Sequence, residues 1–216
     1  MVSITADTVV DAMTWRYATK AFDKTKTLSE DDKVALLSAL RLAPSSYGLQ
    51  PWKFVVVEDL QVRQQLSDLV PAKKSKFEDS SLLVVIARRK VTTAEHVAQH
   101  IETLQKARAV SADEIQPFKD MLTQRAANRP AEAQDIWNSR QTYVALGCAL
   151  TAAAMLRVDA CPMEGVNPEK FDEVLGLTGT DFTTTVAIAF GYQDERDPFA
   201  KYARARRAPS EVFMNV

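Results

Sequence analysis

The sequence contains few glycines and histidines, which excludes several common kinds of site. Its six glycines are too far apart to form the G-x-G-x-x-G of a Rossmann dinucleotide site or the G-x-x-x-x-G-K-[ST] of a P-loop. The only histidines, His96 and His100, could both point at one metal ion, but no further ligands cluster near them. We therefore expect no metal site. We also expect no Ser–His or Cys–His hydrolytic pair, because neither histidine lies in an active-site-like turn.

The sequence also has few cysteines and almost no net charge. Cys148 and Cys161 have no C-x-x-C spacing, which indicates buried thiols in a reducing compartment. The net charge of −1 makes no electrostatic case for nucleic acid as a partner. We see no signal peptide, and the longest largely apolar stretch, 144–156, is too short to span a bilayer. We expect a cytoplasmic protein that binds neither nucleic acid nor a membrane.

Hydrophobic periodicity and capping residues predict both helices and strands. Helices are expected over 5–15, 29–43, 59–69, 93–107, 111–128, 130–156 and 167–176, and strands over 53–58, 81–87 and 183–190. The expected apolar stripes are Val9, Val10 and Met13 in the first helix, and Val34, Leu36, Leu37 and Leu40 in the second. The helix over 130–156 is almost wholly apolar after Thr142, which is typical of a core or of an oligomer interface, and we favour an interface for part of it. With no linker or internal repeat, residues 1–216 are expected to form a single domain.

Two polar segments follow predicted helices and allow two interpretations each. The segment 43–52 contains Pro44 and Pro51, which stop the helix, and it is either a connector or a loop shaped to lie against a flat polar ligand. In the segment 16–22, Arg16 and Lys20 flank a threonine hydroxyl. They form either a solvated basic patch or an anion cradle, since arginine and lysine both bind phosphate oxygens.

Two later segments also carry candidate groups. Residues 159–165 read as a turn in which Pro162 fixes φ, Glu164 is the acid and Gly165 permits a close backbone approach. The tail after 195 is rich in arginine and ends in an apolar stretch, Val212 to Met214. Tails of this kind are often mobile, whereas the apolar end favours docking onto a second subunit.

Together these segments resemble the FMN-dependent nitroreductase family, especially its oxygen-insensitive bacterial branch. The resemblance rests on R-x-x-T-K-A-F-D at 16–23, P-S-S-x-x-x-Q-P-W at 44–52 and P-x-E-G at 162–165, and it covers nearly the whole chain. It implies an α+β fold with a central mixed, largely antiparallel sheet flanked by helices. It further implies an intertwined homodimer with exchanged C-terminal extensions, tightly bound FMN between the subunits, and NADH or NADPH as a transient electron donor.

The resemblance also implies roles for particular residues. Arg16 and Lys20 should contact the FMN phosphate and the ribityl or pyrimidine edge, Lys76 the N1/O2 edge, and Gln141 the flavin. Ser45 and Ser46 should reach the FMN held by the other subunit, and Glu164 and Gly165 should present backbone N–H groups to N5. The tail phosphate contacts are either Arg204 and Arg206 or Arg207, because the register is ambiguous. The remaining expected cofactor contacts are Tyr17, Ala18, Pro44, Gln50, Lys73, Pro162 and Met163.

The substrate side is where the chain departs from the family pattern. Tyr47 and Gly48 replace a common Thr-Asn pair and are expected to touch substrate, and Phe118 resembles an aromatic residue that gates access. Ala18 stands where a serine is common, and Lys73 where an asparagine is frequent. No catalytic side chain is expected, because the flavin carries the chemistry. The expected activity is ping-pong hydride transfer to nitroaromatics, quinones or similar small acceptors. The alternatives are a specialised reductase of pteridines, enones or halogenated aromatics, or an FMN-binding module without turnover.

Overall fold

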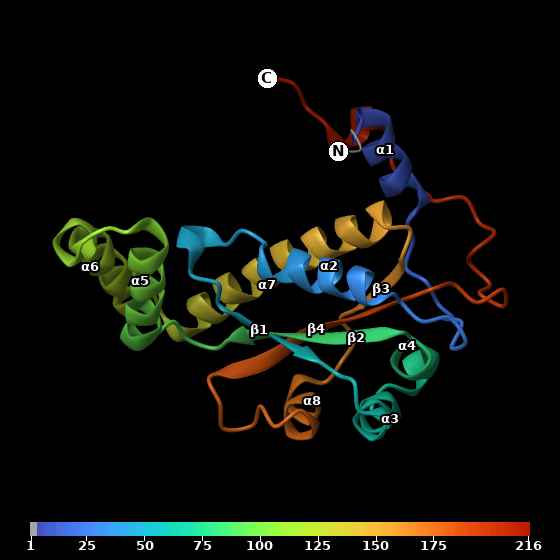
Figure 1. The fold of residues 1–216 in the computed structure, drawn as a ribbon, viewed down its shortest axis with the longest axis horizontal. Coiled ribbons are helices and arrows are strands. Elements are labelled where there is room, and N and C mark those ends of the chain that lie inside the picture. Colours follow the sequence, from blue (N-terminus) through green and yellow to red (C-terminus); the bar gives the residue numbers. More distant parts are fainter. Residues whose placement is uncertain (1–3) are drawn as a thin grey trace.

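The computed structural model describes residues 4–216, and its centre is a four-stranded sheet (Figure 1). The strands are β1 (Trp52–Val56), β2 (Leu82–Arg89), β3 (Asp159–Met163) and β4 (Phe182–Gly191), in the order β1-β2-β4-β3. All three neighbouring pairs are antiparallel. The expected α+β class is confirmed. Ala18, which lies outside the named strands, forms an isolated parallel bridge with Ala160 of β3, so the parallel part of the expected mixed sheet is small in this chain.

Helices cover both faces of the sheet because its central strands are apolar on both sides. Residues 82–87 of β2 and 186–190 of β4 are buried, most of them completely. On one face lie α2 (Glu30–Arg41) and the 25-residue α7 (Ala131–Met155), whose side chains share an apolar cluster with the sheet. On the other lie α3 (Leu60–Asp68), α4 (Lys74–Glu78) and α8 (Pro168–Val174) (Figure 1).

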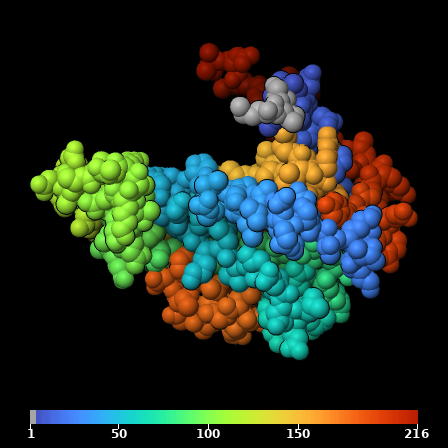
Figure 2. Space-filling model, viewed as in Figure 1, coloured from blue at the N-terminus to red at the C-terminus, as the bar shows by residue number. Residues whose placement is uncertain are grey.

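Two further parts extend from this layered body. The hairpin of α5 (Ala94–Arg108) and α6 (Ala112–Asn128) forms a lobe with its own apolar cluster, and α6 begins with the predicted capping box of Ser111 and Glu114. Helix α1 (Ala6–Trp15) packs on α7 on the opposite side of the molecule, and the chain ends nearby with the short α9 (Pro209–Val212) (Figure 2). Two 3₁₀ turns, η1 (Ser46–Gly48) and η2 (Pro71–Lys73), complete the elements.

The structure corrects three sequence-based expectations. Residues 159–163 form an edge strand rather than a turn, and Pro162 is tolerated there because its missing N–H is not needed on an outer strand. Val34 is exposed, since it lies about 120° around the helix from Leu40, which marks the buried face of α2. In α1 the expected stripe of Val9, Val10 and Met13 is exposed, and only Ala12 is buried.

No helix within residues 4–216 combines the length and the apolar character that a membrane crossing would require.

Candidate functional site

Three lysines from separate segments gather near the end of β3. Lys20 comes from the chain after α1, Lys73 from η2 and Lys76 from α4, and the charges of all three act on the buried Cys161 thiol. Burial lowers the pKa of the Lys76 ammonium, and the nearby charges of Lys20 and Lys73 act in the same direction. Three ammonium groups held this close repel one another, so the cluster is suited to an anionic partner.

Asp197 organises the segment that carries Lys20. Its Oδ2 accepts the backbone N–H groups of Lys20 at 2.6 Å and Ala21 at 3.2 Å, and the hydroxyl of Tyr17 at 2.9 Å. Its Oδ1 accepts the N–H of Phe199 at 2.8 Å. Burial acts to raise the pKa of Asp197, but these hydrogen bonds prevail and lower it. The carboxylate is therefore committed to structure and ties the start of the tail to the Arg16–Lys20 segment.

The tail arginines differ in their surroundings. The Arg204 guanidinium stacks 4.0 Å from the centre of the Tyr17 ring and donates to the carbonyls of Phe199 and Tyr202. Burial lowers the pKa of Arg16, and the charge of Arg206 lowers it further, so these two arginines lie close together. Arg206 and Arg207 are both exposed. The chain thus brings Arg204 next to Tyr17 and Arg206 next to Arg16.

The end of β3 faces these cations with backbone groups. The Lys73 Nζ donates to the Gly165 carbonyl at 2.7 Å, and a Cβ on Gly165 would stand 2.7 Å from that nitrogen. Glycine is therefore required for this approach of Lys73. The Glu164 carboxylate accepts the Tyr143 hydroxyl of α7, and burial together with this hydrogen bond raises the pKa of Tyr143 to about 12. Pro162 and Met163 are the last two residues of the strand.

The loop from Pro44 to Pro51 is held in an unusual conformation. Tyr47, Gly48 and Gln50 have φ values of 58°, 70° and 47°, a region that costs free energy for residues other than glycine. The Ser46 N–H donates to Gln141 Oε1 of α7 at 2.9 Å, and the Gln50 N–H donates to Ser45 Oγ at 2.9 Å. These contacts bring Ser46 and Gln141 together.

The two histidines of α5 hold the same loop. His96 Nε2 lies 2.9 Å from the Leu49 carbonyl, and His100 Nε2 lies 3.0 Å from the Tyr47 carbonyl. Since both partners are acceptors, both rings must donate from Nε2. The spacing that suggested a metal pair thus places two N–H donors on successive turns of one helix. Phe118 of α6 is half-buried and packs in the adjoining apolar cluster with Leu49.

The lysines near the end of β3 and the loop from Pro44 to Pro51 lie in different parts of the molecule. In Figure 1 the η1 loop adjoins α5 and α6 at one end of α7, whereas α1, α4 and the tail lie towards the other. On α7 the loop is held by Gln141, whereas Glu164 at the end of β3 is held by Tyr143, which points about 160° away around the helix. One chain therefore does not bring the predicted phosphate-binding residues and the predicted substrate loop into one site.

Comparison with known proteins identifies the family. Residues 13–192 match the sequence model of the Nitroreductase family. A Staphylococcus aureus protein named "Putative NAD(P)H nitroreductase" is 36% identical over 205 residues, which cover 92% of each chain. The fold matches a Bacillus subtilis structure described as a putative nitroreductase, with a TM-score of 0.85 and 20% identity over 98% of this chain and all of the other. It also matches an Exiguobacterium sibiricum structure, described as a putative nitroreductase in complex with FMN, with a TM-score of 0.81 and 17% identity over 100% and 99% of the two chains.

The protein belongs to the nitroreductase family, whose members are FMN-dependent, and it is an NAD(P)H-dependent oxidoreductase. Sequence reasoning missed Asp197, because a single aspartate in a polar tail carries no pattern that reveals its partners. It also missed Arg125, Arg129 and Trp137, which line a pocket between α6 and α7.

Proposed function

We propose that residues 1–216 form one FMN-binding domain, and that two copies make a homodimer which transfers hydride from NADH or NADPH to a small electron-poor acceptor. The observation that carries this proposal is the division of the site. Within residues 4–216 none of the three lysines near β3 forms a salt bridge, and the loop with Ser45 and Ser46 meets α7 at Gln141, on a different face of the helix from Tyr143, which holds Glu164 at the end of β3. A twofold axis would bring one chain's loop to its partner's cations.

The residues near β3 fit a flavin phosphate. Arg16, Lys20, Arg204 and Arg206 supply the positive charge, and Arg204 Nε is buried with no hydrogen-bond partner among the described residues. A buried polar atom without a partner is costly, and a phosphate oxygen would satisfy it. We assign the phosphate to these four residues, with Tyr17 as the ring on which Arg204 stacks and Ala18 as backbone within reach. FMN, when bound, accepts hydride from the nicotinamide and passes it to the acceptor.

The lysines near Gly165 have an electrostatic role. Lys76 and Lys73 would hold the pyrimidine edge of the ring and stabilise negative charge that develops there, because a half-buried ammonium acts more strongly than one in bulk water. Pro162, Met163, Glu164 and Gly165 would present the backbone to N5. The Glu164 side chain is occupied by Tyr143, which fixes the conformation of this segment.

The second subunit would contribute the opposite wall. Pro44, Ser45, Ser46, Gln50 and Gln141 would lie along the ribityl chain and one flavin edge. Tyr47, Gly48 and Phe118 would contact the acceptor. Exposed apolar residues support such an association, because they lie on α1, on α7 and on the tail, where a partner could cover them; they are Val9, Val10, Met13, Ile136, Tyr143, Val144, Val212, Phe213 and Met214. We propose that the tail crosses to the partner, and that the enzyme works in the cytoplasm.

An absorption spectrum of the unsupplemented protein, repeated without oxygen after addition of NADH or NADPH, tests the function. Flavin bands that bleach establish both the cofactor and the first half-reaction, and a panel of nitroaromatics, quinones, pteridines, enones and halogenated aromatics then defines the acceptor. Bands that persist with both donors favour an FMN-binding module without turnover. A colourless protein that takes up no added FMN refutes the proposal. Light scattering at several protein concentrations tests the dimer.

A further inference from the structure

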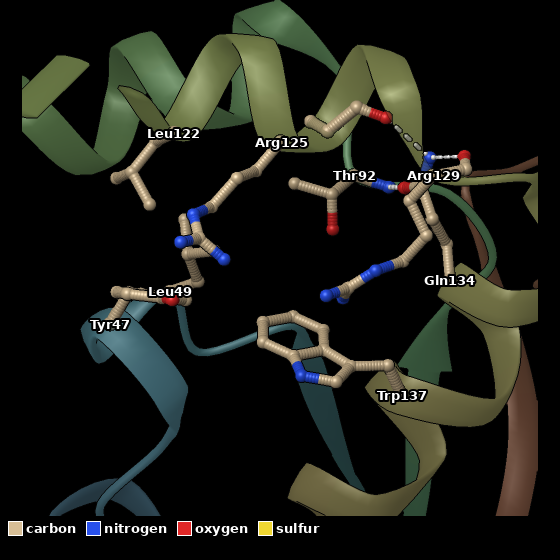
Figure 3. A pocket seen from close by; sticks show the side chains of 9 residues that line it. Tyr47, Leu49, Thr92, Leu122, Arg125, Arg129, Gln134 and Trp137 are labelled. Atoms are coloured by element: carbon tan, nitrogen blue, oxygen red, sulfur yellow. Dashed lines mark hydrogen bonds between the residues drawn. The ribbon is translucent and has the colours of Figure 1, made fainter. Parts of the chain in front are cut away.

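A small pocket lies between α6, the start of α7 and the loop that contains Tyr47 (Figure 3). Figure 3 shows the guanidinium groups of Arg125 and Arg129 entering it from α6, with the Trp137 ring on the opposite side. The lining residues are Tyr47, Leu49, Thr92, Leu122, Arg125, Ala126, Arg129, Gln134 and Trp137. None of them is acidic, so the pocket has two cations and no anion in its walls.

Each guanidinium stacks on an aromatic ring instead of pairing with a carboxylate. Arg125 lies 5.6 Å from the centre of the Tyr47 ring, and Arg129 lies 4.8 Å from that of Trp137. Within residues 4–216 neither arginine forms a salt bridge, and the polar contact of the Arg125 side chain is to the Met121 sulfur at 3.1 Å. Stacking on a ring leaves the N–H edge of a guanidinium free to donate.

The Gln134 amide and the Thr92 hydroxyl are already used, the latter on Asn138 Oδ1 at 3.4 Å. Gln134 Oε1 accepts the Thr92 N–H at 2.8 Å, while its Nε2 donates to the carbonyls of Ala126 at 2.8 Å and Arg129 at 2.9 Å. This amide closes the floor and holds the end of α6 against α7. The two arginines are the charged groups of this pocket, and they have donors to offer to a ligand.

The pocket adjoins the loop to which we assign acceptor binding. Tyr47 and Leu49 belong to both. On α7, Gln141 Nε2 donates to the Trp137 carbonyl at 3.0 Å, and Gln141 Oε1 holds the Ser46 N–H. One helical turn, about 6 Å, thus separates the pocket from the glutamine that we place at the flavin. A group in the pocket could belong to a molecule that also reaches the flavin.

We propose that Arg125 and Arg129 form a subsite for an anionic oxygen group, a carboxylate or a phosphate, on a small molecule that reacts at the flavin. This inference rests on the proposed function and deepens it, because it names the charge that the site selects. A planar carboxylate or a phosphate matches the paired N–H edges of a guanidinium. The carboxylate would belong to an aromatic acceptor, and the phosphate to the 2′-position that distinguishes NADPH from NADH.

Equilibrium binding to the FMN-loaded protein tests the subsite without relying on turnover. Calorimetric titrations would compare 4-nitrobenzoate with its neutral isostere 4-nitrobenzamide, and NADP⁺ with NAD⁺. The variants are Arg125→Gln, Arg129→Gln and both together. Arg157→Gln is the matched control, because that arginine is exposed, also lies over an aromatic ring, and follows the end of α7 opposite to the pocket. Thermal unfolding of each variant checks that its fold is intact.

In at least one of the two pairs, we expect the wild type to bind the probe with the additional anionic group roughly tenfold more tightly than the probe without it. The double variant should lose this preference, while Arg157→Gln keeps it. Loss confined to the nitrobenzoate pair assigns the subsite to an acceptor carboxylate, and loss confined to NADP⁺ against NAD⁺ assigns it to the donor phosphate. A wild type without preference in either pair, or a double variant that retains it, overturns the proposal.

The proposed function fails by a different observation. A protein that takes up no FMN refutes the flavin role, and the same titrations then measure the anion preference on the protein as purified. A protein that binds FMN and reduces neutral acceptors, but prefers no anion, keeps the function and loses the subsite.

Discussion

Replacing Asp197 with alanine should destabilise the protein strongly, although the residue lies in the polar C-terminal region. The side chain is 4% exposed and accepts four hydrogen bonds, from Tyr17, Lys20, Ala21 and Phe199. A buried donor left without an acceptor costs about 1–3 kcal/mol. If water reaches half of the freed donors, the loss in unfolding free energy is about 2–6 kcal/mol.

Chemical denaturation at pH 7 and constant protein concentration measures this loss. Glu102→Ala is the control, because Glu102 pairs with Lys106 on the exposed face of α5, where an ion pair contributes little to stability. An Asp197→Ala loss below about 1 kcal/mol, or one equal to that of the control, would refute the role of Asp197 as the anchor of this segment.

The pH dependence gives a second check on Asp197. Its pKa is lowered in the folded protein, so its contribution is fully present above the unfolded pKa of about 3.9 and is lost as the pH falls through the folded value. The stability difference between wild type and Asp197→Ala should therefore shrink below about pH 4. A difference that stays constant through acidification would contradict the hydrogen-bonded carboxylate.

Three further outcomes are expected. Lys20→Ala should weaken FMN retention by about 1.5–3 kcal/mol, whereas Lys24→Ala, at an exposed position, should not; unchanged flavin affinity in the first variant rejects the role of Lys20. Gly165→Ala should displace the Lys73 ammonium and weaken FMN binding roughly threefold, with little change in stability. If the effects of Gly165→Ala and Lys73→Met on FMN binding add fully in the double variant, the Gly165→Ala effect does not act through Lys73. Burial lowers the pKa of His96 to about 4. Wild-type stability should therefore decline as the pH falls from about 6.5 to about 4, and His96→Gln should decline less over that range in urea titrations; identical profiles would refute this.

Local sequence signals were sufficient for most of the elements. Ser29, Asp59, Thr93, Ser111 and Asn167 each cap the helix that follows, as side chains that accept a backbone N–H in the first turn. The apolar runs in β2 and β4 predicted strands, and these strands are buried because their side chains are apolar on both faces of the sheet. The family itself was identified from three short motifs, and the match over residues 13–192 confirms it.

Long-range partners could not be predicted in this way. The strand at 159–163 contains a proline and an acid, and only its pairing with β4 makes it a strand. His96 and His100 looked like a possible metal pair, whereas the fold gives their N–H groups two loop carbonyls. Arg125 and Arg129 carry no motif, and they converge only because α6 folds back on α7.

By itself the sequence determined most of the secondary structure, the α+β class and the family, because these depend on local propensity, on apolar periodicity and on short motifs. The tertiary structure decided which distant groups meet. It joined Asp197 to Lys20 across 177 residues, gathered three lysines around Cys161, and set the loop at Tyr47 against α5 and α7. The physical reason is that electrostatics and hydrogen bonding act over a few ångströms in space, and only the packed chain determines which residues lie within that range.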